Sequence, residues 1–80
     1  MATIMVIDDS RATRALAKRT LVEAGYNVVE ATDGGDAMDK ARVARVDVYV
    51  CFTAQPTDLP IIMASLQPSQ LLAAVRKALP

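Results

Sequence analysis

The sequence contains no histidine and no tryptophan, and it has one cysteine, Cys51, and one phenylalanine. Without histidine, the chain has no histidine-based catalytic triad and lacks a ligand of most zinc sites. A single cysteine excludes an intrachain disulfide, and its apolar neighbours predict a buried, unreactive thiol in a reducing compartment. Nine basic and nine acidic residues give a formal net charge of zero, without the positive field that attracts nucleic acids and acidic membranes. We expect neither of these partners.

The length and composition predict a single folded domain. Eighty residues fall within the usual size of one domain, and a hydrophobic content of 52% is too high for a disordered chain. The uncharged stretch from Leu59 to Ala74 contains prolines and several polar residues, so it does not predict a transmembrane helix. The N-terminus lacks the basic and apolar pattern of a signal peptide. We therefore expect one cytoplasmic domain that spans residues 1–80.

Apolar periodicity predicts seven secondary-structure elements. The strands are expected at residues 3–7, 26–31, 46–52 and 60–64, and the helices at residues 11–24, 35–44 and from 68 onwards. Asp9 or Ser10 can cap the first helix, Gly25 ends it, and Asp33 can cap the second. Strands that alternate with helices are typical of a mostly parallel sheet covered on both faces. The order βαβαββα therefore predicts a three-layer α/β domain.

Two adjacent carboxylates, Asp8 and Asp9, directly follow the first apolar strand. This is the edge of the sheet at which open α/β folds bind ligands. Adjacent carboxylates repel each other, and a divalent cation would stabilise both. In the alternative interpretation Asp9 or Ser10 caps the first helix and Asp8 is a solvated loop residue. The dipeptide taken alone favours this structural interpretation.

The order of residues resembles the receiver domain of two-component response regulators, the CheY-like, flavodoxin-like fold. The segment IMVIDDSRATRALAKRTLVEAGYNVVEATDGGDAMDKA is similar to the first half of a receiver, up to the start of its second helix. LPIIMAS is similar to the family's fourth strand with its terminal hydroxyl residue, and QPSQLLAAVRKAL to its last helix. The resemblance implies a shortened receiver, because no residues correspond to the family's third helix, fourth helix or fifth strand.

The resemblance also implies roles for individual residues. Asp8 and Asp9 match the family's metal-binding acidic pair, and Ser65 matches the hydroxyl residue that senses the phosphoryl group. Phe52 stands at the position of the phosphoacceptor aspartate and cannot accept a phosphoryl group. The family's lysine at the end of the fifth strand has no counterpart. We therefore expect no aspartyl phosphorylation, no enzymatic activity and no required cofactor, with Mg²⁺ bound weakly at most.

The connection between the third and fourth apolar runs is short. Parallel neighbours normally need a crossover of a dozen or more residues, and only Thr53 to Pro60 are available here. Three arrangements remain open: an antiparallel hairpin, a fourth strand that pairs with another chain, and a fourth run outside the sheet. We favour the hairpin among them.

The missing helices predict an apolar surface. One face of the sheet keeps only an alanine-rich helix as cover, and exposed apolar patches of several hundred Å² usually mark protein contacts. We expect this patch, and a homodimer interface, to be formed by these residues or by their alternates along the strands: Val48, Val50, Phe52, Ile61 and Met63. The dimer could form directly or by exchange of the segment from Pro60 to Pro80.

The sequence thus predicts a receiver-like protein-interaction module of two-component phosphorelay signalling, with a protein partner. Two alternatives stay open. One is an Mg²⁺-dependent receiver that is phosphorylated on an unorthodox carboxylate, Asp8 or Asp9. The other is a shortened fragment kept only for its fold.

Overall fold

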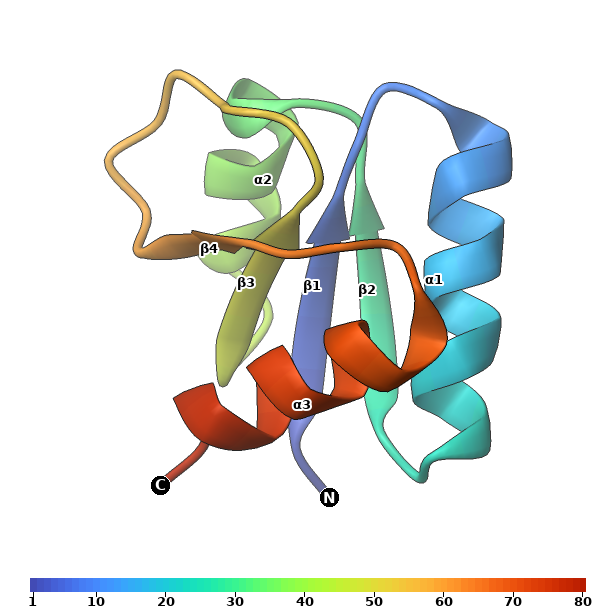
Figure 1. The fold of residues 1–80 in the computed structure, drawn as a ribbon. Helices are drawn as coiled ribbons and strands as arrows, with labels where there is room; N and C mark the ends of the chain where they lie inside the picture. Colours follow the sequence, from blue (N-terminus) through green and yellow to red (C-terminus); the bar gives the residue numbers. More distant parts are fainter.

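The computed structural model describes all 80 residues of the chain. The elements follow the predicted order, βαβαββα (Figure 1). Their bounds are β1 Thr3–Ile7, α1 Arg11–Glu23, β2 Asn27–Ala31, α2 Gly34–Ala41, β3 Val48–Cys51, β4 Ile61–Met63 and α3 Pro68–Ala78. Each element lies where the sequence predicts it, although α2 ends and β3 starts inside the predicted ranges. None of the helices is long and apolar enough to cross a membrane.

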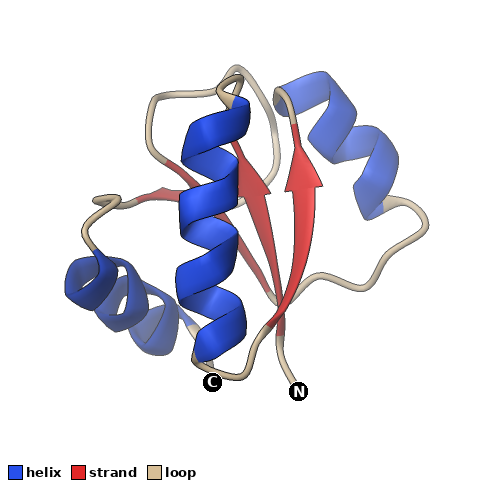
Figure 2. Cartoon of the chain, turned by 90° about the vertical axis from the view of Figure 1, so that its right-hand side faces the viewer, coloured by secondary structure: helices blue, strands red, loops and turns tan.

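The strands form one sheet in the order β2-β1-β3-β4, and every neighbouring pair is parallel. Helices α1 and α3 cover one face of this sheet, and α2 lies against the other face (Figure 2). The strand order is that of a flavodoxin-like sheet without its fifth strand. The fold is therefore a shortened flavodoxin-like domain with three layers.

The parallel pairing of β3 and β4 shows that the expected hairpin was wrong. Tyr49 lies opposite Ile61, and Cys51 lies opposite Met63. The two strands are so short that the connection has to return along only about 10 Å of strand. The nine residues from 52 to 60 can extend over about 30 Å. A crossover without a helix is thus long enough to join two parallel strands of this length.

The connection from β3 to β4 packs against the start of α2 and runs beside it in Figure 1. A Cβ atom at Gly34 would lie 3.0 Å from the carbonyl oxygen of Pro56 and 3.1 Å from Cβ of Thr57. Further along the connection, half-buried Leu59 packs on the core cluster of the α2 face. The connection therefore covers part of the surface that a third helix would otherwise occupy.

Two apolar clusters hold the layers together. The cluster on the α1/α3 face contains Ile4, Val6, Ala17, Leu21, Val48, Val50, Leu71 and Val75. The cluster on the α2 face contains Met5, Ile7, Ala31, Ala37 and Cys51. Strand β1 contributes alternate residues to both clusters, as the continuous apolar run in its sequence predicts. Full burial of a side chain of this size contributes about 1.5–3 kcal/mol.

The core placement corrects part of the predicted interface. Val48 and Val50 belong to the α1/α3 cluster and are 4% and 0% exposed, so they cannot form an open patch. The residues that point to the opposite side of β3 and β4 lie on the α2 face. There Tyr49 and Ile61 are half-buried, and Met63 is 64% exposed. The third strand is apolar on both faces, and the alternation alone does not reveal which face α1 and α3 cover.

Substitution at Gly34 tests the contact between α2 and the connection. Gly34→Ala should lower the free energy of unfolding by about 1–3 kcal/mol, because the added methyl group would displace the Pro56 backbone. Gly35→Ala is the matched control, since its nearest new contact is a carboxylate oxygen of Asp33 at 3.4 Å. This control should be neutral or stabilising by up to about 1 kcal/mol. Urea unfolding measures both, and equal effects would contradict the proposed packing.

Candidate functional site

The carboxyl ends of β1, β2 and β3 lie at one edge of the sheet because these strands are parallel. This edge is at the top of Figure 1, opposite the two chain termini. Asp8 follows β1, Thr32 follows β2 and Phe52 follows β3. Ligands of open α/β sheets bind at this edge, so it is the place to look for a functional site.

The two adjacent carboxylates differ in environment. Asp8 is 5% exposed, and its Oδ1 accepts a hydrogen bond from the N–H of Ser10 at 2.7 Å. Asp9 is exposed, and its carboxylate makes no hydrogen bond or ion pair. Ser10 is the N-cap of α1, because its hydroxyl accepts from the N–H of Thr13 at 3.2 Å. The structure thus assigns the cap to Ser10 and leaves Asp9 as the free carboxylate.

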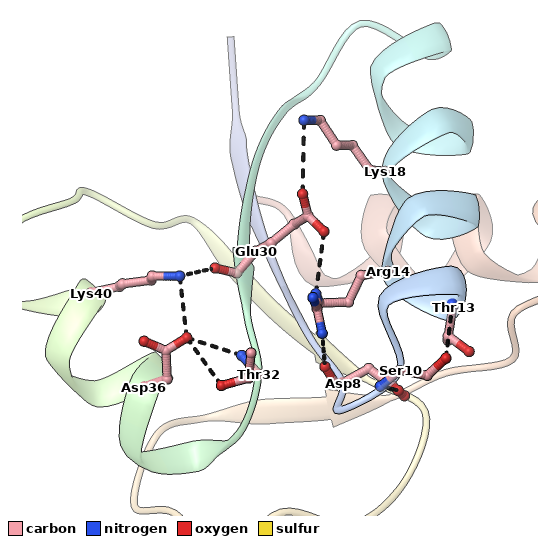
Figure 3. A network of polar contacts seen from close by, with 9 residues as sticks. All are labelled: Asp8, Ser10, Thr13, Arg14, Lys18, Glu30, Thr32, Asp36 and Lys40. Carbon is pink, nitrogen blue, oxygen red and sulfur yellow. Dashed lines mark hydrogen bonds and ion pairs between the residues drawn. The ribbon is translucent and has the colours of Figure 1, made fainter.

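A polar network fastens this edge to the helices (Figure 3). Arg14 donates from Nη1 to the backbone oxygen of Asp8 at 2.6 Å and from Nε to Oε1 of Glu30 at 3.2 Å. The Arg14 side chain is only 13% exposed, whereas Lys18, 3.8 Å from Oε2 of Glu30, is half exposed. The network therefore connects α1 to both β1 and β2 through one mostly buried guanidinium group.

The other half of the network fastens α2. Asp33 caps this helix by accepting from the N–H of Asp36 at 2.8 Å, as the sequence predicts. Asp36 in turn accepts from the N–H of Thr32 at 3.0 Å and pairs with Lys40 at 3.2 Å. The hydrogen bond from Thr32, with that from Lys40, holds the pKa of Asp36 below its usual value. Lys40 also donates to the backbone oxygen of Glu30 at 2.6 Å.

The end of β3 carries no reactive group. Cys51 is buried, as the sequence predicts. Burial raises the pKa of its thiol; a hydrogen bond from the backbone of Thr53 lowers it, and the negative charge of Asp8 raises it further. The next residue, Phe52, is half-buried and packs on the α1/α3 cluster. A protonated thiol and an apolar ring thus occupy this end of the strand.

Ser65 lies on the connection from β4 to α3, which crosses the α1/α3 face of the sheet in Figure 1. Its side chain is exposed, and its hydroxyl accepts from the N–H of Gln67 at 3.1 Å. No hydrogen bond joins it to Asp8 or Asp9. The structure therefore brings the acidic pair and Phe52 to one edge and uses the Ser65 hydroxyl to form a local turn.

Metal-ligating side chains are few at this edge. No group of three or more histidine, cysteine, aspartate or glutamate side chains comes close enough to hold a metal ion. Asp8 and Asp9 could together offer carboxylate oxygens to a hard cation such as Mg²⁺, with water completing its coordination. The edge therefore offers at most two carboxylates to a cation, and no third protein carboxylate lies beside them.

Comparison with known proteins identifies the family. No protein-family model matches the chain, and no curated protein matches it significantly. The solved structure of the chemotaxis response regulator CheY4 of Vibrio cholerae is 26% identical, with a TM-score of 0.80 and 99% of both chains covered. A response regulator protein from Burkholderia multivorans is 30% identical, with a TM-score of 0.60, over 98% of this chain and 77% of its own. The chain belongs to the response-regulator family and has its CheY-like receiver fold.

The sequence singled out Asp8, Ser10 and Asp33 but not the ion pairs of the network. Asp36 and Lys40 are four residues apart in one helix, a spacing at which opposite charges attract, so this pair could have been found. Arg14 and Glu30 lie on different elements, 16 residues apart, and no sequence pattern joins them. Their contact exists only because α1 packs beside β2 in the folded chain.

The lowered pKa of Asp36 makes part of the stability pH-dependent. A carboxylate whose pKa is lower in the folded chain stabilises it above its unfolded pKa of about 3.9, and this contribution is lost as the pH falls through the folded pKa. Asp36→Asn should therefore be less stable than the wild type at neutral pH, and the difference should shrink in acid. Asp39→Asn, which removes an unpaired carboxylate of the same helix, is the control. A pH-independent difference for Asp36→Asn, measured by urea unfolding, would contradict the argument.

Proposed function

We propose that the chain is a receiver-like protein-interaction module of two-component signalling that is not phosphorylated on aspartate. The observation that carries this proposal is Phe52, an apolar residue packed on the core directly after β3. By the family resemblance this is the place of the phosphoacceptor. The similar structures are response regulators by name, which supports a role in signalling through protein partners.

Phosphoryl transfer needs an acceptor, a divalent cation and positive groups that stabilise the transferred charge. At this edge the acceptor is missing, and the nearby cations are already engaged. Arg14 is held by Glu30 and the Asp8 backbone, and Lys40 is held by Asp36 and the Glu30 backbone. The positive charges of the network thus support the fold rather than a reacting phosphoryl group.

A second candidate function keeps the Mg²⁺-dependent phosphorylation and moves it to Asp8 or Asp9. The exposure of Asp9 is the one feature that favours this alternative. Against it, the same two carboxylates would have to ligate the cation and accept the phosphoryl group. A third candidate, a fragment kept only for its fold, makes no contact with any partner.

We further propose that the chain self-associates, directly or by exchange of the segment from Pro60 to Pro80. Support comes from the α2 face of β3 and β4, where α2 does not reach and Tyr49 and Ile61 stay half-buried. In the monomer, β4 pairs with β3 of the same chain. Because the sheet is complete without exchange of that segment, direct association is the simpler form.

Phosphorylation is tested by incubation with acetyl phosphate and Mg²⁺, followed by intact mass. The chain should gain no phosphoryl group, because Phe52 offers no oxygen. A complete receiver treated in parallel is the control for the phosphodonor. A stoichiometric, base-labile gain that maps to any aspartate would overturn the proposal, and its loss in Asp9→Asn would establish the second candidate.

Mg²⁺ binding should be weak because only Asp8 and Asp9 supply carboxylates. Backbone amide shifts around these residues should not saturate at low millimolar metal. Phe52→Asp adds a third carboxylate and should tighten binding by at least about tenfold, at a cost of about 1–3 kcal/mol in stability. Phe52→Asn introduces a side chain of the same size as aspartate without its charge, and it should leave the affinity for Mg²⁺ unchanged. Tight, saturable binding to the wild type would contradict this prediction.

A further inference from the structure

The open edge of β4 is where we propose that two copies of this chain meet: β4 of one copy pairs antiparallel with β4 of the other, and the two sheets become one. This inference rests on the proposed role as an interaction module and names the partner surface and its occupant. The strand order places β4 at the edge, and β3 is its only neighbouring strand. No helix lies directly against its backbone.

Successive residues of β4 direct their backbone N–H and C=O groups alternately toward β3 and toward the open edge of the sheet. Ala64 donates to the carbonyl oxygen of Cys51 at 2.9 Å, so Ala64 and Ile62 direct their backbone groups toward β3. Ile61 and Met63 therefore direct theirs toward the open edge. The N–H of Ile61 is already bonded to the carbonyl oxygen of Leu59 at 2.8 Å, and this leaves the N–H of Met63 and both carbonyl oxygens unpaired.

One register of an antiparallel pair of β4 strands gives hydrogen-bond partners to these unpaired backbone groups. With a twofold axis beside Met63, the N–H and C=O of this residue bond to the C=O and N–H of Met63 in the second copy. Ile61 then lies opposite Ser65 of the second copy, whose N–H has no hydrogen-bond partner within its own chain. That N–H can donate to the carbonyl oxygen of Ile61. Each strand thus supplies backbone donors and acceptors for the unpaired groups of the other.

The strand at this edge carries none of the charged residues with which proteins usually block unwanted pairing. The chain carries no charged residue from Leu59 to Val75, so pairing of the two β4 strands brings no like charges opposite each other. Met63 is 64% exposed, and in the antiparallel pair its apolar side chain packs on its symmetry mate. A hollow of about 370 Å³ beside the strand has a mainly apolar lining, formed by Ile62, Met63, Ala74 and Ala78, with Lys77 as its one charged residue.

A second copy fits this surface better than an unrelated partner does, because the unpaired backbone groups are complementary under twofold symmetry. The contact is small. The paired strands are only three residues long in each copy, so the dimer should be weak, and concentrations of about 10 to 500 µM are the range in which to look for it. The dimer should therefore form and dissociate as the concentration of the chain changes.

Sedimentation velocity across this range of concentrations measures the association. Met63→Lys places two like charges directly opposite each other and should weaken the dimer by at least about tenfold. Because Met63 is exposed, the variant should fold, which circular dichroism checks. Leu16→Lys replaces a residue of α1 that is 57% exposed and belongs to another surface, so it should leave the dimer unchanged.

Cross-linking tests the register. In a Cys51→Ala background, Met63→Cys brings two thiols to a hydrogen-bonded pair with Cα atoms about 5.5 Å apart, within reach of a disulfide. This variant should form a disulfide-linked dimer under mild oxidation. Val43→Cys, at a residue that is 89% exposed and away from β4, should give only slow collisional products.

The outcomes separate this inference from the proposed function. A chain that stays monomeric at every concentration overturns the pairing, together with the proposed self-association, and leaves the result of the phosphorylation experiment untouched. A dimer that persists in Met63→Lys and does not cross-link through Met63→Cys also overturns it, since the copies then meet elsewhere. A phosphorylated chain that still dimerises through Met63 would overturn the proposed function alone.

Discussion

The burial of β1 on both faces is the constraint on which the rest of the structure depends. Its last four side chains, Ile4 to Ile7, are 0% exposed and alternate between the two core clusters. A strand with this pattern needs a helix layer on each side and a neighbouring strand along each edge. The placement of α1, α3 and α2, and the pairing with β2 and β3, follow from this need. Asp8 comes next in the chain and is thereby carried to the carboxyl edge.

The chain loses two helices and a strand relative to a full receiver without losing this central arrangement. The connection from β3 to β4 takes over part of the missing cover through Leu59 and through the contact of Pro56 with Gly34. What it does not replace is cover along the outer edge of β4. The shortening therefore leaves the core intact and concentrates its consequence at one edge of the sheet. That edge lies two strands away from β1 and the acidic pair that follows it, so association at β4 does not involve those carboxylates.

The positions of the elements and their caps could be predicted from the sequence because each rests on a local signal. Ser10 and Gly25 mark the ends of α1, and Asp33 marks the start of α2. The direction of β4 could not be predicted, because a sequence shows the length of a connection but not the distance that it must cover. The face on which Val48 points was equally hidden, since both sides of β3 are apolar.

In the candidate site, too, features with a local signal could be predicted from the sequence, and long-range contacts could not. Asp8 and Phe52 could be placed at the carboxyl edge because each directly follows a predicted strand. The hydrogen bonds of Arg14 join segments that are distant in the chain, so their partners appear only in the folded molecule. Cys51 could be predicted to be buried, but the influence of Asp8 on its pKa depends on the pairing of β1 with β3.

The position of β4 at the edge of the sheet, with β3 as its only neighbouring strand, also bears on how the molecule opens. Elements with few packed neighbours open locally at a small cost in free energy, whereas amides of a central strand exchange with solvent only when the whole domain unfolds. The amides of Ile62 and Ala64 should accordingly exchange their hydrogens well before those of Met5 and Val6. Strand β4 is therefore the less protected end of the sheet, and the first strand sets the slowest exchange in it.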